Sequence, residues 1–468
     1  MGQDKILILG AGPAGMACAM ELHKADKQFT IVEKDEQVGG LSKTYQLGDF
    51  RTDNGPHRFF SQNKYLYDFI EDLLGEKWIT VDRCTRFYID GKFYQYPVEW
   101  KDALSNMGLF KAGWAFLDYL AARIRFLNKE SDNFEDFAVS NFGRTLAEFN
   151  MLNYTEKIWG LPCTQLSVDW AQQRIKGLTL RSLLANAILK KSGPKTLVDQ
   201  FYYPNLGTGL IYEAIKDRIS EQNPVLLSNE PVRFEHNGSR MKKVTLKNGE
   251  TYTDPKSVIS SIPMTSLLDM LDPAPPTPVS EAMANLKYRS QAYLFLTLNK
   301  PTISKDQWIY FPDREVPFGR ISEMRNFSEL MSPKGKTSLF VEFFCWKDDE
   351  IWNMTKEDLF ELAIAWLDKL EFVNREEVID IYHIRKENAY PVYDLDYKKN
   401  LDTVKEFLDG IENLIYIGRP GRFKYTNQDH SLEMGILAAR SIIDGKKYNI
   451  EDVGAEEEYF ERGYAKSS

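Results

Sequence analysis

The chain has 468 residues, of which 43% are hydrophobic and 27% charged, values that are ordinary for a soluble globular protein of two or three domains. Its formal net charge of −9 argues against a general nucleic-acid-binding surface, so an anionic substrate would need local arginines. The four cysteines are scattered without a CxxC pair and the five histidines do not cluster with them, so we expect neither a disulfide framework nor a metal site.

The first predicted element is a strand–turn–helix–strand unit over residues 5–33. The apolar run 6–9 leads into the turn GAGPAG, and a small-residue helix and a second apolar run follow. In a dinucleotide-binding unit the glycines allow a tight turn, a close approach to a pyrophosphate and close helix packing, while an acid accepts from the ribose hydroxyls. The predicted contacts are Gly10, Gly12, Ala14, Gly15 and Glu33. A glycine-rich turn of another α/β protein is the alternative interpretation.

A second pair of glycines follows the acid, in the sequence VGGLS at residues 38–42. Paired glycines at this place let backbone amides pass beside a flavin phosphate or ribityl chain, although a plain turn is the simplest reading of two glycines alone. Their position after Glu33 favours FAD over NAD. We therefore predict Gly40, Leu41 and Ser42 as further FAD contacts.

An amphipathic segment with interspersed lysines and arginines spans residues 100–127. It could contact a membrane or a partner, but we expect a helix that packs on the core. No run of about 18 apolar residues occurs, and the early first strand leaves no room for a signal peptide. We expect a cytoplasmic protein with no stable membrane insertion.

The rest of the chain predicts an interrupted domain. Hairpin-like runs occur within residues 225–265, at 232–234, 241–246 and 251–252; buried strands are expected at 257–263 and 414–419, and a helix at 431–444. The expected FAD-binding domain is discontinuous and comprises residues 1–64, 221–284 and 391–450. The expected substrate domain comprises residues 65–220, which look mostly helical, and 285–390, which mix strands with a helix; an acidic tail, 451–468, is expected to be mobile.

Three segments carry a resemblance to a known family. Residues 54–61 read NGPHRFFS, residues 154–162 read YTEKIWGLP, and residues 418–431 read GRPGRFKYTNQDHS. With the glycine turn, they resemble the superfamily of FAD-dependent amine oxidases, protoporphyrinogen oxidase and UDP-galactopyranose mutases, and they are most similar to the mutases, although Gly-Pro replaces the mutases' Gly-Gly in the first segment. The resemblance implies an α/β fold in which a glutathione-reductase-like Rossmann FAD domain carries an inserted helical and α+β substrate domain.

The resemblance also implies roles for individual residues. It implies FAD contacts for Gly418, Arg419, Tyr425, Asn427, Gln428 and Ser431. It implies nucleotide-sugar contacts for Tyr154, Trp159, Arg174, Tyr310, Arg320, Tyr390, Tyr425 and Asn427. Arginine forks suit phosphate oxygens, so Arg174 and Arg320 would hold a diphosphate and, with His57 on the flavin loop, form the catalytic set.

Plainer interpretations stand beside these roles. Trp159 alone is more often a core residue, and each arginine alone could belong to an internal ion pair. His57 could simply satisfy a buried backbone carbonyl. Residues 429–431 could serve only to cap the last helix, whose N-terminus could otherwise support negative charge on the flavin.

The implied activity is a ring isomerisation of a UDP-galactopyranose/furanose-type nucleotide sugar through an adduct at N5 of the reduced flavin, with NAD(P)H as a candidate reductant. The alternative is an FAD-dependent oxidoreductase of the protoporphyrinogen oxidase or amine oxidase type that uses oxygen or another acceptor. A flavin-binding protein without turnover is a third interpretation. The sugar, the base and the existence of a homo-oligomer are left open.

Overall fold

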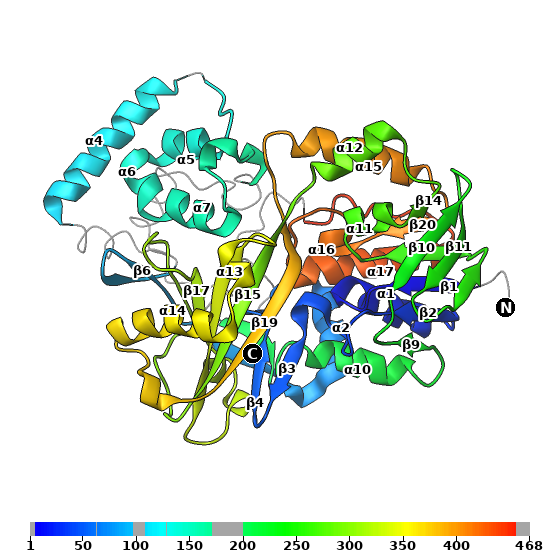
Figure 1. Ribbon diagram of the computed structural model, residues 1–468, viewed down its shortest axis with the longest axis horizontal. Coiled ribbons are helices and arrows are strands. Elements are labelled where there is room, and N and C mark those ends of the chain that lie inside the picture. The colour runs from blue at the N-terminus through cyan, green and yellow to red at the C-terminus, as the bar shows by residue number, and fades with distance from the viewer. Residues whose placement is uncertain (1–4, 62, 97–107, 128, 171–199, 455–468) are drawn as a thin grey trace.

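The structure is a computed structural model that describes residues 5–61, 63–96, 108–127, 129–170 and 200–454. Two of the expectations above fall outside these residues: Arg174 and nearly all of the acidic tail. The described chain forms three main sheets with helices packed around them (Figure 1). It is a mixed α/β fold, as the sequence predicts.

A five-stranded parallel sheet is the centre of the dinucleotide-binding part, with the strand order β20-β13-β1-β2-β9. The strands are β1 (Ile6–Leu9), β2 (Phe29–Val32), β9 (Val225–Leu226), β13 (Ser257–Ser260) and β20 (Leu414–Tyr416). Every residue of β1 and β2 is buried, because apolar clusters pack on both faces of the sheet. Ile8 lies between Ile31 and Ile259, so the sheet joins three distant parts of the chain, as expected for a Rossmann domain.

Four helices share an apolar core with this sheet. They are α1 (Pro13–Lys24), α2 (Lys64–Leu74), α10 (Leu210–Ile219) and α17 (Gln428–Asp444). Glycine permits the closest approach, because a Cβ on Gly435 of α17 would lie 2.1 Å from the carbonyl oxygen of Ala14 on α1. Helices α2 and α10 fall in the block expected to form the substrate domain, yet their apolar faces are buried with the Rossmann helices. The packing therefore groups α2 and α10 with the Rossmann sheet, whereas the expected domain boundaries at residues 64 and 221 assign both helices to the substrate domain.

A four-stranded sheet flanks the Rossmann sheet, in the order β12-β11-β10-β14. Its strands are β10 (Pro231–His236), β11 (Met241–Leu246), β12 (Thr251–Thr253) and β14 (Leu271–Asp272). The helices beside it are α11 (Met264–Asp269), α12 (Thr277–Ala284) and α15 (Tyr397–Asp409). The hairpins predicted within residues 225–265 are confirmed by the antiparallel pairing of β10, β11 and β12.

A seven-stranded sheet forms the opposite side of the molecule, in the order β19-β15-β18-β17-β16-β6-β7. The strands are β6 (Thr85–Ile89), β7 (Lys92–Gln95), β15 (Tyr288–Leu298), β16 (Trp308–Tyr310), β17 (Arg320–Glu323), β18 (Thr337–Cys345) and β19 (Val378–Pro391). Helices α13 (Glu350–Asn353) and α14 (Lys356–Lys369) pack on it, and Thr355 begins α14 with a capping box to Asp358. All residues of β15 are buried, so neither face of this strand is exposed to solvent.

The block 65–220 contains more strand than the sequence predicts. Besides β6 and β7, it contributes β5 (Trp78–Asp82) and β8 (Gln200–Pro204), which pair with each other. A separate hairpin of β3 (Thr44–Leu47) and β4 (Phe50–Asp53) precedes it. The described helices of this block are α4 (Leu109–Arg125), α5 (Phe134–Phe142), α6 (Arg144–Leu146), α7 (Asn153–Trp159), α2 and α10. Helices make up most of the described part of the block, as expected, and the strands are an addition to them.

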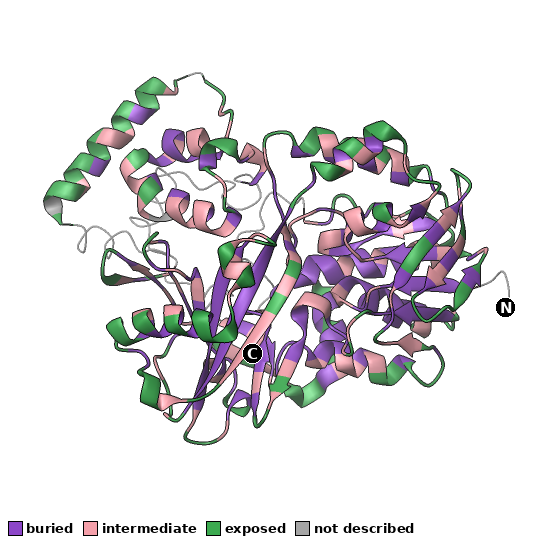
Figure 2. Cartoon of the chain, in the orientation of Figure 1, coloured by how far each residue is buried: buried purple, intermediate pink, exposed green. Residues whose placement is uncertain are grey.

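Helix α4 lies at the outer edge of the molecule (Figure 1) and most of it is exposed (Figure 2). Its apolar side chains include Phe110, which is 98% exposed, and Ile124, which is 77% exposed. In the described part of the segment predicted to pack on the core, residues 100–127, only the face with Ala115 and Ala122 does so, and the large apolar side chains do not. None of the described helices is long and apolar enough to cross a membrane.

Candidate functional site

A cavity of about 790 Å³ lies between the Rossmann sheet and the seven-stranded sheet. The glycine turn after β1 lines one end, and residues of β15, β16, β17 and β19 line the other. The N-terminus of α17 and the His57 loop lie along its walls. The volume and the mixed apolar and polar lining suit a large cofactor with a substrate beside it.

The glycine turn has an open position where a phosphate would need one. Gly12 caps α1 with φ −77° and ψ −176°, a backbone that any residue can adopt. A Cβ on Gly12 would meet no atom closer than 3.8 Å, so the fold itself does not require glycine there. By contrast, a Cβ on Gly15 would lie 2.0 Å from the carbonyl oxygen of Gly10, so Gly15 serves packing. The open space at Gly12, at the N-terminus of a 12-residue helix, fits a pyrophosphate.

The carboxylate of Glu33 is held in place at the same end of the cavity. Its Oε2 accepts a hydrogen bond from the amide of Ala11 at 2.7 Å, and its Oε1 accepts one from the amide of Asp35 at 3.0 Å. The side chain is buried and also lines the cavity. A carboxylate fixed at this position can accept from ribose hydroxyls, as the sequence predicts.

The second pair of glycines packs against the first turn. Gly39 and Gly40 have φ of +109° and +55°, and a Cβ on Gly40 would lie 2.9 Å from Cα of Gly12. The amide of Gly39 donates to the carbonyl of Ala11 at 2.8 Å. Gly40, Leu41 and Ser42 all line the cavity, so the two glycine segments form one continuous backbone surface. That surface suits the phosphates of FAD.

The segment after β20 turns sharply into the cavity wall. Gly418 has φ +76° and a Cβ there would lie 3.1 Å from that of Ala14. The Arg419 guanidinium donates from Nε to the carbonyl of Thr426 at 2.9 Å and lies 5.1 Å and 4.9 Å from the ring centres of Tyr390 and Tyr425. Arg419 thus holds its own loop and two tyrosines, and it also lines the cavity, where the resemblance implies an FAD contact.

Helix α17 begins earlier than the sequence predicts, at residue 428 instead of 431. Asn427 is its N-cap and forms a capping box with His430. Asn427 and Ser431 line the cavity, so the N-terminus of a 17-residue helix opens onto it. Gln428 also lines the cavity, and its amide donates to Thr208 at 3.1 Å and to Tyr212, which ties α17 to α10. Asn427 therefore caps the helix and lines the cavity at the same time.

Arg320 and Tyr310 are paired neighbours on β17 and β16 at the other end of the cavity. Arg320 forms a fork with Glu342 on β18, in which Nε and Nη2 each donate to a carboxylate oxygen at 2.7 Å. Burial opposes the charge on Arg320, but the charge and hydrogen bonds of Glu342 outweigh it and hold the Arg320 pKa well above its usual range. The internal ion pair foreseen as an alternative is present, and Arg320 still lines the cavity with Nη1 outside the pair.

The predicted aromatic residues form two groups. Tyr390 stacks on Tyr425 with ring centres 5.5 Å apart, and both line the cavity. Tyr154 contacts the ring of Tyr310 edge-on at 5.4 Å, so it lies behind a cavity residue. Trp159 is buried in the core, 1% exposed, with its ring edge-on to Tyr390 and Tyr425. It supports the tyrosine pair from behind, which agrees with the plainer interpretation of this residue.

His57 lies in the cavity wall, where its Nδ1 donates to the carbonyl of Gly55 at 3.1 Å. A carbonyl can only accept, so Nδ1 carries the proton and Nε2 keeps a lone pair. Burial, and then the positive charges of Arg419 and Arg320, lower the pKa of His57 to about 3. The imidazole is therefore neutral near pH 7 and acts as an acceptor at Nε2, not as a proton donor from an imidazolium.

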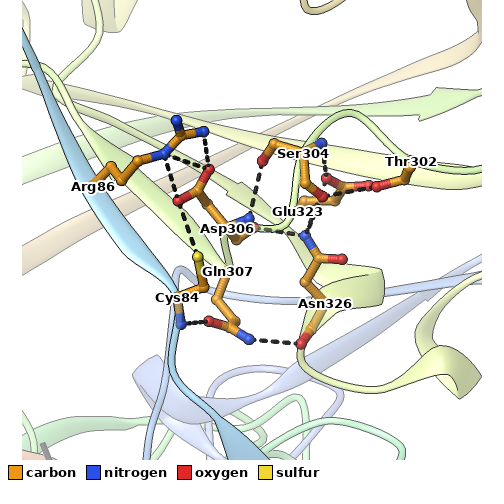
Figure 3. Close-up of polar contacts among 8 residues, drawn as sticks. All are labelled: Cys84, Arg86, Thr302, Ser304, Asp306, Gln307, Glu323 and Asn326. Atoms are coloured by element: carbon orange, nitrogen blue, oxygen red, sulfur yellow. Dashed lines mark hydrogen bonds and ion pairs between the residues drawn. The ribbon is translucent and has the colours of Figure 1, made fainter. Parts of the chain in front are cut away.

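A polar network fixes the strands that carry Tyr310 and Arg320 (Figure 3). Arg86 of β6 forms a fork with Asp306 just before β16, with its Nη2 donating at 2.6 Å. The Asn326 amide after β17 donates to the carbonyl of the same Asp306 at 2.7 Å. These bonds connect β6, β16 and the end of β17, and so they hold the strands of the cavity wall together.

Other residues that shape the site were not predicted. Lys157, in the YTEKIWGLP segment, donates to the carbonyls of Phe311, Asp313 and Val316 at 2.7, 2.5 and 2.8 Å, which anchors the loop between β16 and β17. Asp53 accepts from Tyr203 at 2.7 Å at the start of the His57 loop, and burial raises its pKa to about 6. Lys157 lies within a recognised segment, but the flanking residues do not reveal the role of either residue, since each acts through contacts distant in sequence.

Comparison with known proteins agrees with this geometry. The sequence model of the flavin containing amine oxidoreductase family matches residues 13–396. A probable UDP-galactopyranose mutase of Klebsiella pneumoniae is 26% identical over 466 residues, which cover 95% of this chain and 96% of that protein. A 1-hydroxycarotenoid 3,4-desaturase of a Flavobacterium species is 31% identical, over only 20% of each chain.

Solved structures show the same fold over the full length. The crystal structure of reduced UDP-galactopyranose mutase superposes with a TM-score of 0.84 at 23% identity and covers 98% of this chain and 97% of its own. A putative protoporphyrinogen oxidase of an Exiguobacterium species has a TM-score of 0.71 at 17% identity, with 95% and 99% coverage. Because the family model spans far more than half of the sequence, and because the glycine turns fit a flavin dinucleotide, this chain belongs to the flavin containing amine oxidoreductase family.

Proposed function

We propose that this protein is an FAD-dependent nucleotide-sugar mutase that interconverts the pyranose and furanose forms of a UDP-galactose-type sugar. The observation that carries the proposal is the likeness to the Klebsiella mutase over 95% of this chain and 96% of that protein. The desaturase likeness covers a fifth of each chain, which supports shared cofactor binding more than shared chemistry.

FAD would lie along the cavity from the glycine turns to the His57 loop. Gly12 and Gly40 would border the pyrophosphate, and Glu33 would accept from a ribose hydroxyl. The N-terminus of α17, at Asn427, would face the flavin ring and favour negative charge on it. When bound and reduced, the flavin supplies the electron-rich centre that the ring isomerisation needs, and NAD(P)H is the proposed reductant.

The remaining wall would hold the substrate. Nη1 of Arg320 lies outside the fork with Glu342, so it can donate to a diphosphate oxygen without breaking that pair. A guanidinium fixed before the substrate arrives stabilises charge that develops on the leaving diphosphate without reorganising. Tyr310 and Tyr390 would add hydrogen bonds to the substrate. Arg174, which lies outside the described residues, is proposed as the second diphosphate arginine.

His57 would position the flavin through its neutral ring. With the proton on Nδ1 committed to Gly55, Nε2 is free to accept a hydrogen bond from a bound group. The imidazole cannot act as a general acid near pH 7, because its pKa is lowered to about 3. We therefore assign it an orienting role.

One observation favours a second candidate, an oxidoreductase of the amine oxidase type. The buried carboxylate of Glu342 neutralises Arg320, so this end of the cavity is less cationic than a diphosphate site could be. The stacked rings of Tyr390 and Tyr425, which line the cavity, would also suit a cationic amine. Such a substrate would transfer a hydride to the oxidised flavin. Oxygen would then reoxidise the reduced flavin.

The test is turnover of UDP-galactofuranose by the FAD-loaded protein, with and without dithionite, followed by chromatography of the isomers. The proposal expects interconversion only after reduction, and a loss of at least about tenfold in Arg320→Ala. Arg375→Ala, which removes an arginine from an exposed ion pair with Glu361, is the matched control and should keep full activity. Absence of interconversion, together with oxygen uptake on primary or secondary amines, would overturn the mutase proposal in favour of the oxidoreductase.

A further inference from the structure

Helix α4 and the residues that follow it expose an unusual number of large apolar side chains. Among the described residues, seven of the eleven exposed large apolar side chains lie between residues 110 and 127. They are Phe110, Trp114, Phe116, Leu117, Leu120, Ile124 and Leu127. Figure 2 shows the helix as mostly exposed along its whole length, at the edge of the molecule. Scattered apolar side chains are normal on a surface, but a continuous group marks a contact site.

The six of these side chains that lie on the helix itself, all but Leu127, share one face of it. At about 100° per residue, they fall within an arc of roughly 160°. Ala115 and Ala122, which are buried, lie on the opposite face. The basic residues Arg123, on one side, and Lys111 and Arg125, on the other, are exposed and flank the arc. An outward apolar face with cations at both borders is the arrangement of a helix that lies in a membrane interface.

The inner face of α4 is firmly attached to the protein. A Cβ on Gly143, at the end of α5, would lie 2.8 Å from Cα of Tyr119, so the two backbones are in close contact. The Asp118 carboxylate accepts a hydrogen bond from the amide of Thr145 at 2.6 Å. The helix is thus already packed on the face that carries its small residues. Its large apolar face is not needed for folding onto the neighbouring helices.

The charges on α4 select an anionic partner. Asp118, the one acidic residue of the helix, is committed to Thr145, whereas the chain as a whole carries a net charge of −9. Lys111 pairs with Asp90 at 2.9 Å, but both side chains are more than half exposed, and such pairs contribute little. A second copy docked on this face would bring the same cations together without acidic partners. Anionic phospholipid headgroups would instead complement them.

We propose that α4 is a peripheral membrane anchor that lays its outer apolar face in the interface of a bilayer containing anionic phospholipid. The helix does not span the membrane, since none of the described helices is long and apolar enough. Trp114 and Phe110 would lie at the level of the headgroups and acyl chain ends, and Arg123 and Arg125 would contact phosphates. The proposal does not depend on the proposed mutase activity.

The test is flotation of the purified FAD-loaded protein with vesicles of equimolar phosphatidylcholine and phosphatidylglycerol, beside vesicles of phosphatidylcholine alone. We expect the protein to float with the anionic vesicles and at least about tenfold less with the neutral ones. Binding to the anionic vesicles should fall about tenfold or more in the triple variant Phe110→Ser/Trp114→Ser/Leu117→Ser. Val232→Ser/Leu330→Ser/Leu395→Ser, which changes three exposed apolar side chains elsewhere, should float like the wild type.

Flavin content and circular dichroism of each variant establish that it is folded before flotation. The proposal is overturned if the wild type stays in the aqueous fraction with both kinds of vesicle, or if the α4 variant floats as well as the wild type. It is also overturned if light scattering shows a wild-type dimer that the α4 variant abolishes, without vesicle binding, because the face would then be covered by a second copy.

Discussion

Replacing Gly12 with alanine separates cofactor binding from folding. The backbone there suits alanine, and the nearest atom to the new Cβ is 3.8 Å away, so the apoprotein should change in stability by no more than about 1 kcal/mol. The methyl group would fill the space proposed for the pyrophosphate. We expect FAD affinity to fall about 10- to 100-fold, which is about 1.4–2.7 kcal/mol.

Titration of the apoprotein with FAD, followed by flavin fluorescence, measures the affinity, and urea unfolding of the apoprotein measures the stability. At a hundred times its Kd, FAD should stabilise the wild type by about 2.7 kcal/mol, and at the same FAD concentration the gain in Gly12→Ala should fall to about 0.4–1.4 kcal/mol. Gly15→Ala is the contrasting variant, because its Cβ would lie 2.0 Å from the Gly10 carbonyl and should destabilise the apoprotein itself. Wild-type FAD affinity in Gly12→Ala would refute the placement of the pyrophosphate.

Two further predictions concern charged groups in the cavity wall. Glu342→Gln should lower the free energy of unfolding by about 2–3 kcal/mol, since it leaves Arg320 without its counter-charge. The control Glu361→Gln, in an exposed ion pair, should have no measurable effect. Equal urea midpoints for the two variants would contradict this. His57→Asn tests the lowered pKa of His57. Between about pH 6.5 and pH 3, His57 of the unfolded chain binds a proton and His57 of the native protein does not. The free energy of unfolding of the wild type therefore falls as the pH drops through this range. Between pH 6.5 and pH 5 the wild-type apoprotein should lose up to about 2 kcal/mol more than His57→Asn in urea unfolding, and parallel pH profiles would show that His57 titrates normally.

Local pattern was sufficient for the dinucleotide-binding unit. The apolar runs of β1 and β2, the small residues of α1 and the glycine turn between them are neighbours in sequence as well as in space. The same holds for the hairpins over residues 231–253. These elements have a period and a turn chemistry of their own, so their type follows from the residues alone.

Contacts distant in sequence explain what the sequence did not reveal. The partner of Arg320 is Glu342, which lies opposite it only because β17 and β18 pair in that register. Trp159 belongs to a motif, yet Trp170 and the tyrosine pair enclose it in the core. Neither the strand register nor this enclosure has a signature in the flanking residues.

Helix α4 shows a different limit. Its periodicity correctly predicts an amphipathic helix, but a hydrophobic stripe does not say whether protein or another surface covers it. The deciding features are the small residues Ala115 and Ala122, which pack inward, and Gly143 of the neighbouring helix, which lets α5 approach. These features are visible only when the two helices are placed together.

The central claim is that one cavity holds FAD at the glycine turns and a nucleotide diphosphate at Arg320. A crystal structure of the FAD-loaded protein with UDP bound tests this claim most directly. The account predicts the FAD pyrophosphate beside Gly12, and a UDP phosphate oxygen within hydrogen-bond distance of Arg320 with the Glu342 fork intact. UDP bound elsewhere, or an FAD pyrophosphate away from Gly12, would contradict it.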